Sequence, residues 1–351
     1  MKKTGLYPLK FEPIYQEKVW GGRKLLDLGK ELPGNDRDTI GESWELADLA
    51  QTSFSGAGGG AARSIVSNGP LKGMRLHDII ELYGKDLMGN MPLSPQGGFP
   101  LLVKFLDAEE NLSVQVHPNK AYADTHDNAF IKSECWYVMC ANEGAVIYRG
   151  VKEGVTEKQF RKAIANHTVR DLLIEVPVKA GDCYYVPSGT CHALGEGIAV
   201  AEVQTPSDTT FRVYDWNRTG RELHIDQAMQ CIKMGPPDVS RTEINTVIQG
   251  EYARITHLME CLHFRIDRIQ VRKGFKCNIN WHQPVIWMML DGKGHFSSED
   301  APHTSYKRGQ TILLPAKMAQ CKFTAEEDTT YLEVSFPQVD DTRLAKKLTD
   351  D

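Results

Sequence analysis

Short runs of apolar residues, many of them alternating with polar ones, predict β-strands over most of the chain. In the stretch LSVQVH (112–117), leucine and valine alternate with Ser113, Gln115 and His117. Successive side chains of a strand point to opposite faces, so these three polar side chains should share one face. Comparable runs lie at 100–108, 134–141, 146–150, 182–186, 198–204 and 211–215, and through 250–336.

Helical spacing of apolar residues is confined to a few segments. Residues 74–87 (MRLHDIIELYGKDL) carry leucine, isoleucine and tyrosine at the spacing of one helical face. Residues 156–174 predict one or two helices, with Thr156 near the beginning, and residues 221–233 predict another. Strands are therefore expected to dominate the fold.

Two segments in the two halves of the chain resemble each other. GDCYYVPSGTCH (181–192) and GQTILLPAKMAQ (309–320) both place proline six residues after glycine (181 to 187, 309 to 315). A strand with tryptophan and a glycine turn precede each copy, with Trp136 before Gly144 and Trp287 before Gly294. This internal repeat favours two related β units.

The fold class predicted from these features is mainly β. Many short strands separated by glycine and proline turns favour a jelly roll or sandwich. We expect two jelly-roll β-barrels with a small helical insertion near 156–174. The first predicted domain, which carries the chemistry, covers residues 1–240, and the second, degenerate one covers residues 241–351.

Composition and charge narrow the class of protein. The chain has 351 residues, of which 41% are hydrophobic, enough for one large or two medium cores. Its net charge is -5 and it has no stripe rich in lysine or arginine, so nucleic acid is not an expected partner. No apolar run suits a signal peptide or a membrane span. We therefore expect a cytoplasmic protein without a membrane partner, and a monomer, with a homodimer left open.

The cysteines do not form a disulfide pattern. The chain has eight, none of them in a CxxC pair, and several lie in apolar runs such as the one around Cys135. Reduced, buried thiols are the simpler interpretation.

Four side chains of the first unit are candidates for one metal site. Gln115 and His117 share a strand face, Glu134 lies two residues before Trp136, and His192 ends the first repeat copy. Imidazole and carboxylate ligands suit Zn²⁺ and leave positions for water or substrate, and similar sets serve Fe(II). Each residue taken alone is explained more simply, as an exposed or hydrogen-bonded histidine or as a glutamate at the solvent end of a strand.

The repeat favours the metal over these simpler explanations. Alignment of the two copies puts Gln320 where the first has His192, and Val285 where the first has Glu134. If the halves are related, only the first unit retains side chains that bind metal.

Several segments, taken in order, resemble the type I phosphomannose isomerases in their shorter bacterial form. They are EKVWGGRKL (17–25), GESWELA (41–47), NGPLKG (68–73), QVHP (115–118), KSE (132–134), VPSGTCHAL (186–194) and TTFRVYDWNR (209–218). The resemblance covers residues 7–235 strongly and the remainder weakly. It implies a zinc-dependent cupin that interconverts D-mannose 6-phosphate and D-fructose 6-phosphate, so a small sugar phosphate is the expected partner.

The resemblance also implies a metal site, residue by residue. His117, Glu134 and His192 match the ligands of one zinc ion per chain, and Gln115 matches a fourth ligand that some members use. The sequence departs from the longer relatives at 133, where KSE replaces KPE, but lysine and glutamate stay in place.

The remaining implied roles concern the substrate. Arg212 matches the arginine usually assigned as catalytic, Lys132 matches a lysine thought to reach the substrate, and Ser113 matches a serine near the phosphate. Without the resemblance, Lys132 would be a solvated lysine, and Arg212 would equally suit a surface ion pair.

The isomerisation that the resemblance implies needs a cation that stabilises an enediolate and a base that moves a proton. Arg212 stays cationic and can stabilise developing oxyanions or bind phosphate. Glu202, or Lys132 with a lowered pKa, is a candidate base, but Glu202 could instead orient a metal ligand. We therefore count Glu202 only as a residue of the substrate pocket and leave the identity of the base open. Tyr214 is also assigned to the substrate pocket, with packing in the core as the open alternative.

Two other functions stay open at this point. One is a cupin dioxygenase that uses Fe(II), and the other is a cupin that binds sugar phosphates without catalysis. The glycine-rich stretch SGAGGGAA (55–62) is interpreted as a flexible loop or hairpin tip, an insertion that leaves the assignment of the site residues unchanged.

Overall fold

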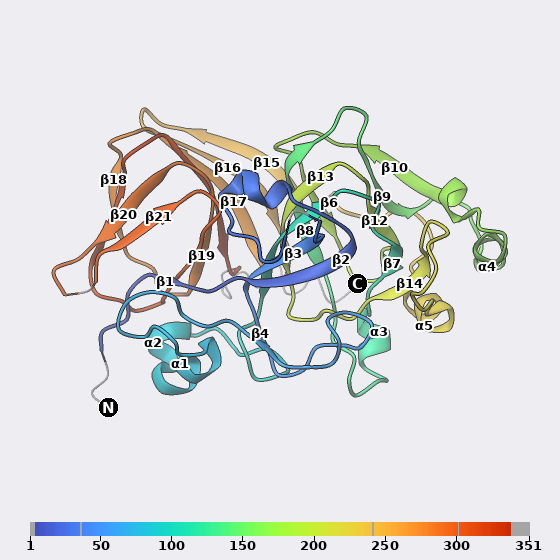
Figure 1. Cartoon of the computed structure of the whole chain (residues 1–351), viewed down its shortest axis with the longest axis horizontal. Coiled ribbons are helices and arrows are strands. Elements are labelled where there is room, and N and C mark those ends of the chain that lie inside the picture. Colours follow the sequence, from blue (N-terminus) through green and yellow to red (C-terminus); the bar gives the residue numbers. More distant parts are fainter. Residues whose placement is uncertain (1–3, 36, 241, 301, 338–351) are drawn as a thin grey trace. The chain divides into compact units, whose positions relative to one another are not determined.

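Strands dominate the computed structural model, which describes residues 4–35, 37–240, 242–300 and 302–337 (Figure 1). The chain divides into two compact units. The larger unit comprises Pro13–Arg63 and Leu93–Val239, and the smaller unit comprises the described residues within Met1–Glu12, Ser64–Pro92 and Ser240–Asp351. The predicted domain boundary after residue 240 stays a prediction, and the compact unit that contains the C-terminal part also includes residues 64–92.

Two antiparallel sheets form the larger unit. The six-stranded sheet has the order β11-β8-β13-β6-β3-β2, and the five-stranded sheet has the order β10-β9-β12-β7-β14. The short strands β4 and β5 form a separate pair. The strands are β2 (Ile14–Gly22), β3 (Ile40–Leu46), β4 (Asp48–Leu49), β5 (Ala62–Arg63), β6 (Leu102–Ala108), β7 (Val114–Val116), β8 (Glu134–Ala141), β9 (Val146–Val151), β10 (Leu173–Pro177), β11 (Cys183–Val186), β12 (His192–Leu194), β13 (Ile198–Gln204) and β14 (Phe211–Tyr214).

The two sheets of the larger unit face one another across a buried core. Trp136 and Val200 of the six-stranded sheet pack in one cluster with Ile147 and Leu194 of the five-stranded sheet. This is the sheet-on-sheet packing of a cupin-type jelly roll. The predicted mainly β, cupin-type fold is confirmed.

Helices cover the other face of the five-stranded sheet. Val114 and Val116 of β7 pack in a cluster with Phe160 and Met229, which lie on two of these helices. Both faces of β7 are therefore occupied, so its polar side chains can point into the space between the sheets. The helices of the larger unit are η1 (Lys24–Leu28), α3 (Lys120–Ala123), α4 (Glu157–Ala165), η2 (Val169–Leu172) and α5 (Ile225–Cys231).

The predicted helical insertion at 156–174 is confirmed in its first part. Thr156 is the N-cap of α4, and it forms a capping box with Gln159. The helical prediction extends too far, because Leu173 begins β10, which pairs with β9. Short apolar runs do not distinguish the end of a helix from the beginning of a strand.

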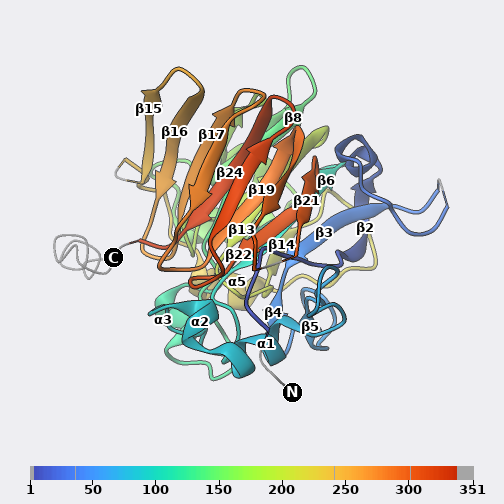
Figure 2. The same ribbon diagram turned by 90° about the vertical axis from the view of Figure 1, so that its left-hand side faces the viewer.

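The smaller unit also has two antiparallel sheets. Their orders are β1-β22-β19-β24-β17-β16-β15 and β18-β23-β20-β21, and Figure 2 shows the first of them in face view. Trp287 and Tyr331 of the first sheet pack against Phe296 and Phe323 of the second. The elements are β1 (Leu9–Lys10), α1 (Leu76–Tyr83), α2 (Lys85–Met88), β15 (Glu243–Gln249), β16 (Ala253–Glu260), β17 (Arg265–Val271), β18 (Lys276–Ile279), β19 (Val285–Asp291), β20 (Lys293–Ser297), β21 (Thr304–Lys307), β22 (Thr311–Leu314), β23 (Cys321–Ala325) and β24 (Thr329–Ser335).

The internal repeat forms an equivalent pair of antiparallel strands in each unit. In the larger unit β11 pairs with β8, with Val186 opposite Glu134. In the smaller unit β22 pairs with β19, with Leu314 opposite Val285. The backbone N–H of Gly181 donates to the carbonyl oxygen of Val138, and that of Gly309 donates to the carbonyl oxygen of Met289, each over 2.8 Å. Each acceptor lies two residues after the tryptophan of its unit. The sequence alignment of the two copies therefore holds in three dimensions.

The cysteines are free thiols, as expected. Six of the eight are buried, Cys277 is half-buried and Cys140 is exposed. None of the helices that the structure describes is both long and apolar enough to cross a membrane.

Candidate active site

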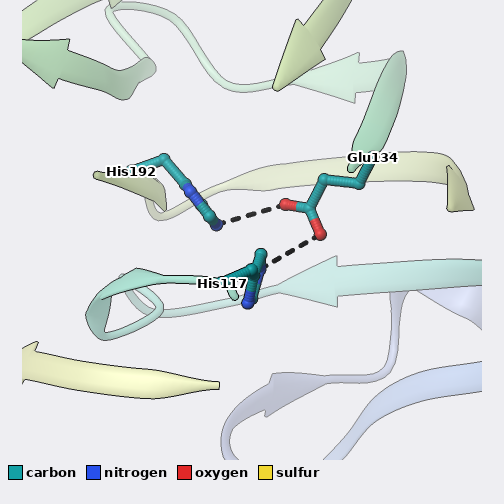
Figure 3. A group of neighbouring side chains, drawn as sticks. All are labelled: His117, Glu134 and His192. Carbon is teal, nitrogen blue, oxygen red and sulfur yellow. Dashed lines mark ion pairs between the residues drawn. The ribbon is translucent and has the colours of Figure 1, made fainter. Parts of the chain in front are cut away.

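The three candidate ligands lie on different strands and converge between the two sheets of the larger unit (Figure 3). His117 follows β7, Glu134 begins β8 and His192 begins β12. Each is 1% exposed. The Nε2 atom of His117 lies 3.3 Å from Oε2 of Glu134, and Nε2 of His192 lies 3.2 Å from Oε1 of the same carboxylate.

Backbone carbonyl groups orient both imidazole rings. The Nδ1 atom of His117 donates to the carbonyl oxygen of Thr209 over 2.9 Å, and Nδ1 of His192 donates to that of Thr190 over 2.8 Å. A neutral ring with its proton on Nδ1 leaves the lone pair on Nε2, which faces Glu134.

This arrangement fits a metal ion. The ligand atoms of the three residues all lie within 4.8 Å of one another. Each Nε2 atom lies 3.2 or 3.3 Å from a different oxygen of Glu134, close to the separation of about 3.3 Å between two ligands that are each about 2.0 Å from zinc. The Nε2 atom of His192 is buried without a hydrogen-bond partner among the described residues. A metal ion would satisfy that atom.

Lys132 dominates the electrostatics of the cluster. Its Nζ atom lies 2.8 Å from Oε2 of Glu134 and 2.8 Å from Nε2 of His117. Burial alone would raise the pKa of Glu134, but Lys132 and the two histidines hold it well below its ordinary value. Burial, followed by Lys132, lowers the pKa of His117 to about 3, so this imidazole is neutral at neutral pH.

Three neighbouring strands of the five-stranded sheet place three predicted residues in one row. On β12, β7 and β14, His192 lies opposite Gln115, and Gln115 lies opposite Arg212. The Oγ atom of Ser113 donates to Oε1 of Gln115 over 3.1 Å. The predicted shared face of Ser113, Gln115 and His117 is therefore the face that holds the cluster.

The six-stranded sheet contributes a second row across from it. Trp136, Glu202, Lys104 and Trp44 lie opposite one another on β8, β13, β6 and β3. Burial, followed by the charge of Glu134, raises the pKa of Glu202 to about 8. Its Oε1 atom has no hydrogen-bond partner among the described residues. A protonated and an ionised form of Glu202 are thus both accessible near neutral pH.

A cavity of about 440 Å³ joins these groups. This volume suits a small ligand such as a sugar phosphate. Of the residues proposed from the sequence, six line it: Ser113, Gln115, Lys132, Glu134, Glu202 and Arg212. His117 and His192 are buried against Glu134.

Tyr214 is not among the lining residues, contrary to its assignment to the substrate pocket. Its side chain packs in the apolar cluster beneath the helices. The register of β14 against β7 shifts between Arg212 and Tyr214, so Tyr214 lies opposite Val114 instead of continuing the face of Gln115. A β-bulge of this kind breaks the two-residue alternation of side chains along the strand.

The structure adds charged residues that sequence reasoning missed. Lys104 and Glu42 line the cavity and form an ion pair of 3.1 Å, and Nε1 of Trp44 donates to Glu42 over 2.6 Å. Burial alone would raise the pKa of Glu42, but Lys104 and Lys18 hold it well below its ordinary value. The available signal was a lysine within the apolar strand PLLVKFLDA, where a charge needs a partner.

The departure at residue 133 has a structural counterpart. The Oγ atom of Ser133 accepts the backbone N–H of Ser188 over 3.0 Å, in the turn that precedes His192. The backbone N–H of Ser133 donates to Oγ1 of Thr205 over 3.1 Å, which a proline could not do. Ser133 thus ties the strand of Glu134 to the turn of His192.

The glycine-rich stretch belongs to the wall of the cavity. Phe54, Ser55 and Gly56 are among the lining residues. The predicted flexible loop or hairpin tip therefore lies at the cavity.

A jelly-roll fold with a buried cluster of two histidines and one glutamate beside a cavity defines a cupin-type protein with a candidate metal centre. A family model described as "Phosphomannose isomerase type I, catalytic domain" matches residues 8–135. The chain is 42% identical to the mannose-6-phosphate isomerase of Streptococcus mutans, over 91% of this chain and 96% of that protein. It is 34% identical to the mannose-6-phosphate isomerase ManA of Bacillus subtilis, over 90% and 95%. The chain belongs to the type I phosphomannose isomerases, a family of enzymes.

Solved structures agree with this assignment. The mannose 6-phosphate isomerase from Bacillus subtilis has a TM-score of 0.81 and 29% identity, with 94% of this chain and 100% of that chain covered. The apo form of the enzyme from Salmonella typhimurium has a TM-score of 0.68 at 15% identity, over 95% and 100%, which supports the fold alone. Membership of an isomerase family favours the isomerase over the dioxygenase and the non-catalytic binding protein.

Proposed function

We propose that this chain interconverts D-mannose 6-phosphate and D-fructose 6-phosphate, with one zinc ion held by His117, Glu134 and His192. The observation that carries the proposal is the convergence of these three buried side chains with Lys132 beside one cavity. The names of its relatives support the substrate pair.

The metal ligands follow from the orientation of the rings. His117 and His192 would each present Nε2, and Glu134 would present a carboxylate oxygen. Gln115, one position away from His192 across the strands, is proposed as a further ligand. A bound zinc ion supplies Lewis-acid chemistry, which stabilises negative charge on the substrate oxygens.

Arg212 and Lys132 are proposed to stabilise the same developing charge. The Nη1 atom of Arg212 donates to the carbonyl oxygen of Glu222 over 2.7 Å, which fixes the guanidinium group at the cavity. A buried, oriented cation is more effective against an oxyanion than one that must be reorganised from water. Ser113, at the same face, is proposed to bind substrate.

Glu202 is proposed to carry the proton between C1 and C2 of the sugar. Its burial raises its pKa to about 8, which places its two protonation states close in free energy near neutral pH. It faces the cavity on the same row as Lys104. If Glu202 instead positions a metal ligand, Lys132 would be the base that transfers the proton.

The purified protein tests the proposal with fructose 6-phosphate as substrate. Mannose 6-phosphate should form, a chelator should abolish its formation, and added Zn²⁺ should restore it. The variant His117→Ala should lose both metal and activity, whereas His282→Ala, which removes an exposed histidine of the smaller unit, should lose neither. A wild-type protein that forms no metal-dependent mannose 6-phosphate would refute the proposal.

The cytoplasmic location and the monomeric state stay predictions from the sequence. Gel filtration combined with light scattering would measure the second.

A further inference from the structure

The loop at 52–60 is closed by its own hydrogen bonds. The backbone N–H and the Oγ1 of Thr52 both donate to the carbonyl oxygen of Gly60, each over 2.8 Å. The backbone N–H of Gly59 donates to Oγ1 of Thr52 over 3.1 Å. The loop therefore has a defined base, from which residues 53–57 project as a tip.

A buried carboxylate holds this tip. The Oδ1 atom of Asp208 accepts the backbone N–H of Ser53, and its Oδ2 atom accepts that of Ala57, both over 2.8 Å. Asp208 is 6% exposed, and it precedes Arg212 in the segment that lines the cavity. The backbone N–H of Thr210 also donates to Oγ of Ser55 over 3.2 Å. Two charge-assisted hydrogen bonds to one buried group fix the position of the tip.

Gly56 permits this close approach. A Cβ atom at residue 56 would lie 2.3 Å from Oδ2 of Asp208 and 2.4 Å from its backbone oxygen. Any larger residue would therefore move the tip away from Asp208. The backbone N–H groups of Ser53 and Ala57 are occupied by Asp208, so they do not serve as a phosphate site.

Phe54 lies at the tip and is the most exposed large apolar side chain that the structure describes, at 86%. It lines the cavity that also contains Lys132, Glu134 and Arg212. The edge of its ring lies close over Gly59, where a Cβ atom would come within 2.8 Å of it. An exposed phenyl ring at the rim of a polar cavity gains free energy when a ligand covers it.

We propose that Phe54 packs over the bound sugar phosphate and strengthens its binding, and that Asp208 is the positioning residue that places it there. The inference rests on the proposed function, since the ligand is the proposed substrate. A sugar presents C–H groups between its hydroxyl groups, and a phenyl ring can cover them.

The first test measures binding with glucitol 6-phosphate, a polyol phosphate that has no carbonyl group and cannot isomerise. In Phe54→Ala, its dissociation constant from the metal-loaded enzyme and the KM for fructose 6-phosphate should rise about tenfold, with kcat changed less than about threefold. Phe54→Leu should recover part of the loss. Leu26→Ala, which truncates a 46% exposed leucine of the same unit, is the control and should change neither value. Unchanged binding in Phe54→Ala would overturn the proposal.

The second test asks whether Asp208 acts through Phe54. Asp208→Asn and Gly56→Ala should each weaken binding of glucitol 6-phosphate, and adding Phe54→Ala to either should weaken it little further, because the ring is already displaced. Fully additive losses would overturn the positioning role. A wild-type enzyme without isomerase activity would refute the proposed function, whereas an active wild type with normal binding in Phe54→Ala would refute only this inference.

Discussion

The ammonium group of Lys132 lies 2.8 Å from the Nε2 atom of His117, on the side of the imidazole that faces the other candidate ligands. One lone pair cannot accept a hydrogen bond from lysine and bind a metal ion at the same time. The lysine and the ion would therefore compete for this atom, and binding of the ion would displace the ammonium group towards the cavity, where the proposed substrate would bind.

Replacement of this lysine should separate metal binding from catalysis. In Lys132→Met, the affinity for Zn²⁺ should rise about tenfold, because a competing cation is removed from its ligands. Isomerase activity should fall by about a hundredfold or more, because a cation that stabilises developing charge is lost. Competition with a chromophoric chelator measures the affinity. A variant that loses its metal, as His117→Ala should, would contradict this role.

Gln115 should be a minor contributor to the metal site. Gln115→Ala should weaken Zn²⁺ affinity about tenfold, well short of the loss in His192→Ala, because a neutral amide oxygen is a weaker ligand than an imidazole or carboxylate. The same chelator competition measures both variants. Gln230→Ala, an exposed glutamine of α5, is the control. Equal losses in Gln115→Ala and His192→Ala would make the amide a principal ligand.

Ser133 should stabilise the larger unit through the turn of His192. Ser133→Ala removes the acceptor of the Ser188 N–H and should lower the free energy of unfolding by about 1 kcal/mol. Ser133→Pro also removes the hydrogen bond to Thr205 and should lower it further. Urea denaturation measures both changes. A fully stable Ser133→Pro variant would show that these bonds add nothing beyond the proline turn of the longer relatives.

Glu333 should make the smaller unit less stable as the pH rises. Burial raises its pKa from 4.5 to about 7, although Nε1 of Trp287 donates to its carboxylate. Below pH 4.5 the carboxyl is protonated in both the folded and the unfolded state, so its ionisation does not lower the free energy of unfolding. Between pH 4.5 and 7 the unfolded state ionises first, and the stability falls by up to about 3 kcal/mol.

Glu333→Gln should remove this fall in stability with rising pH. The variant should be more stable than the wild type at pH 8 and nearly equal to it at pH 4, as measured by denaturant titrations at each pH. Isomerase activity should be unchanged. A wild type whose stability is flat across this range would contradict the raised pKa.

The fold class and the candidate ligands were largely predictable, the first from local patterns and the second from local patterns together with the family resemblance. Alternation in LSVQVH placed Gln115 and His117 on one face, and the repeat aligned Trp136 with Trp287. The matching registers of β8 with β11 and of β19 with β22 agree with that alignment.

What could not be predicted depends on long-range pairing. Nothing near Lys104 in the sequence indicates that Trp44, three strands earlier in the chain, lies beside it. The bulge that turns Tyr214 away from the cavity is a property of the β14 and β7 pair, not of either strand. The attachment of the glycine-rich loop to Asp208 joins residues more than a hundred positions apart.

The two copies of the repeated strand pair carry different polar residues at equivalent positions. The row of Trp136, Glu202 and Lys104 in the larger unit has a counterpart in Trp287, Glu333 and Asp267 of the smaller unit. There the tryptophan satisfies the glutamate directly, and the neighbouring aspartate is paired with Arg265. The same scaffold position thus holds a glutamate with an unsatisfied oxygen beside the cavity in the larger unit, and a glutamate that a tryptophan already satisfies in the smaller unit.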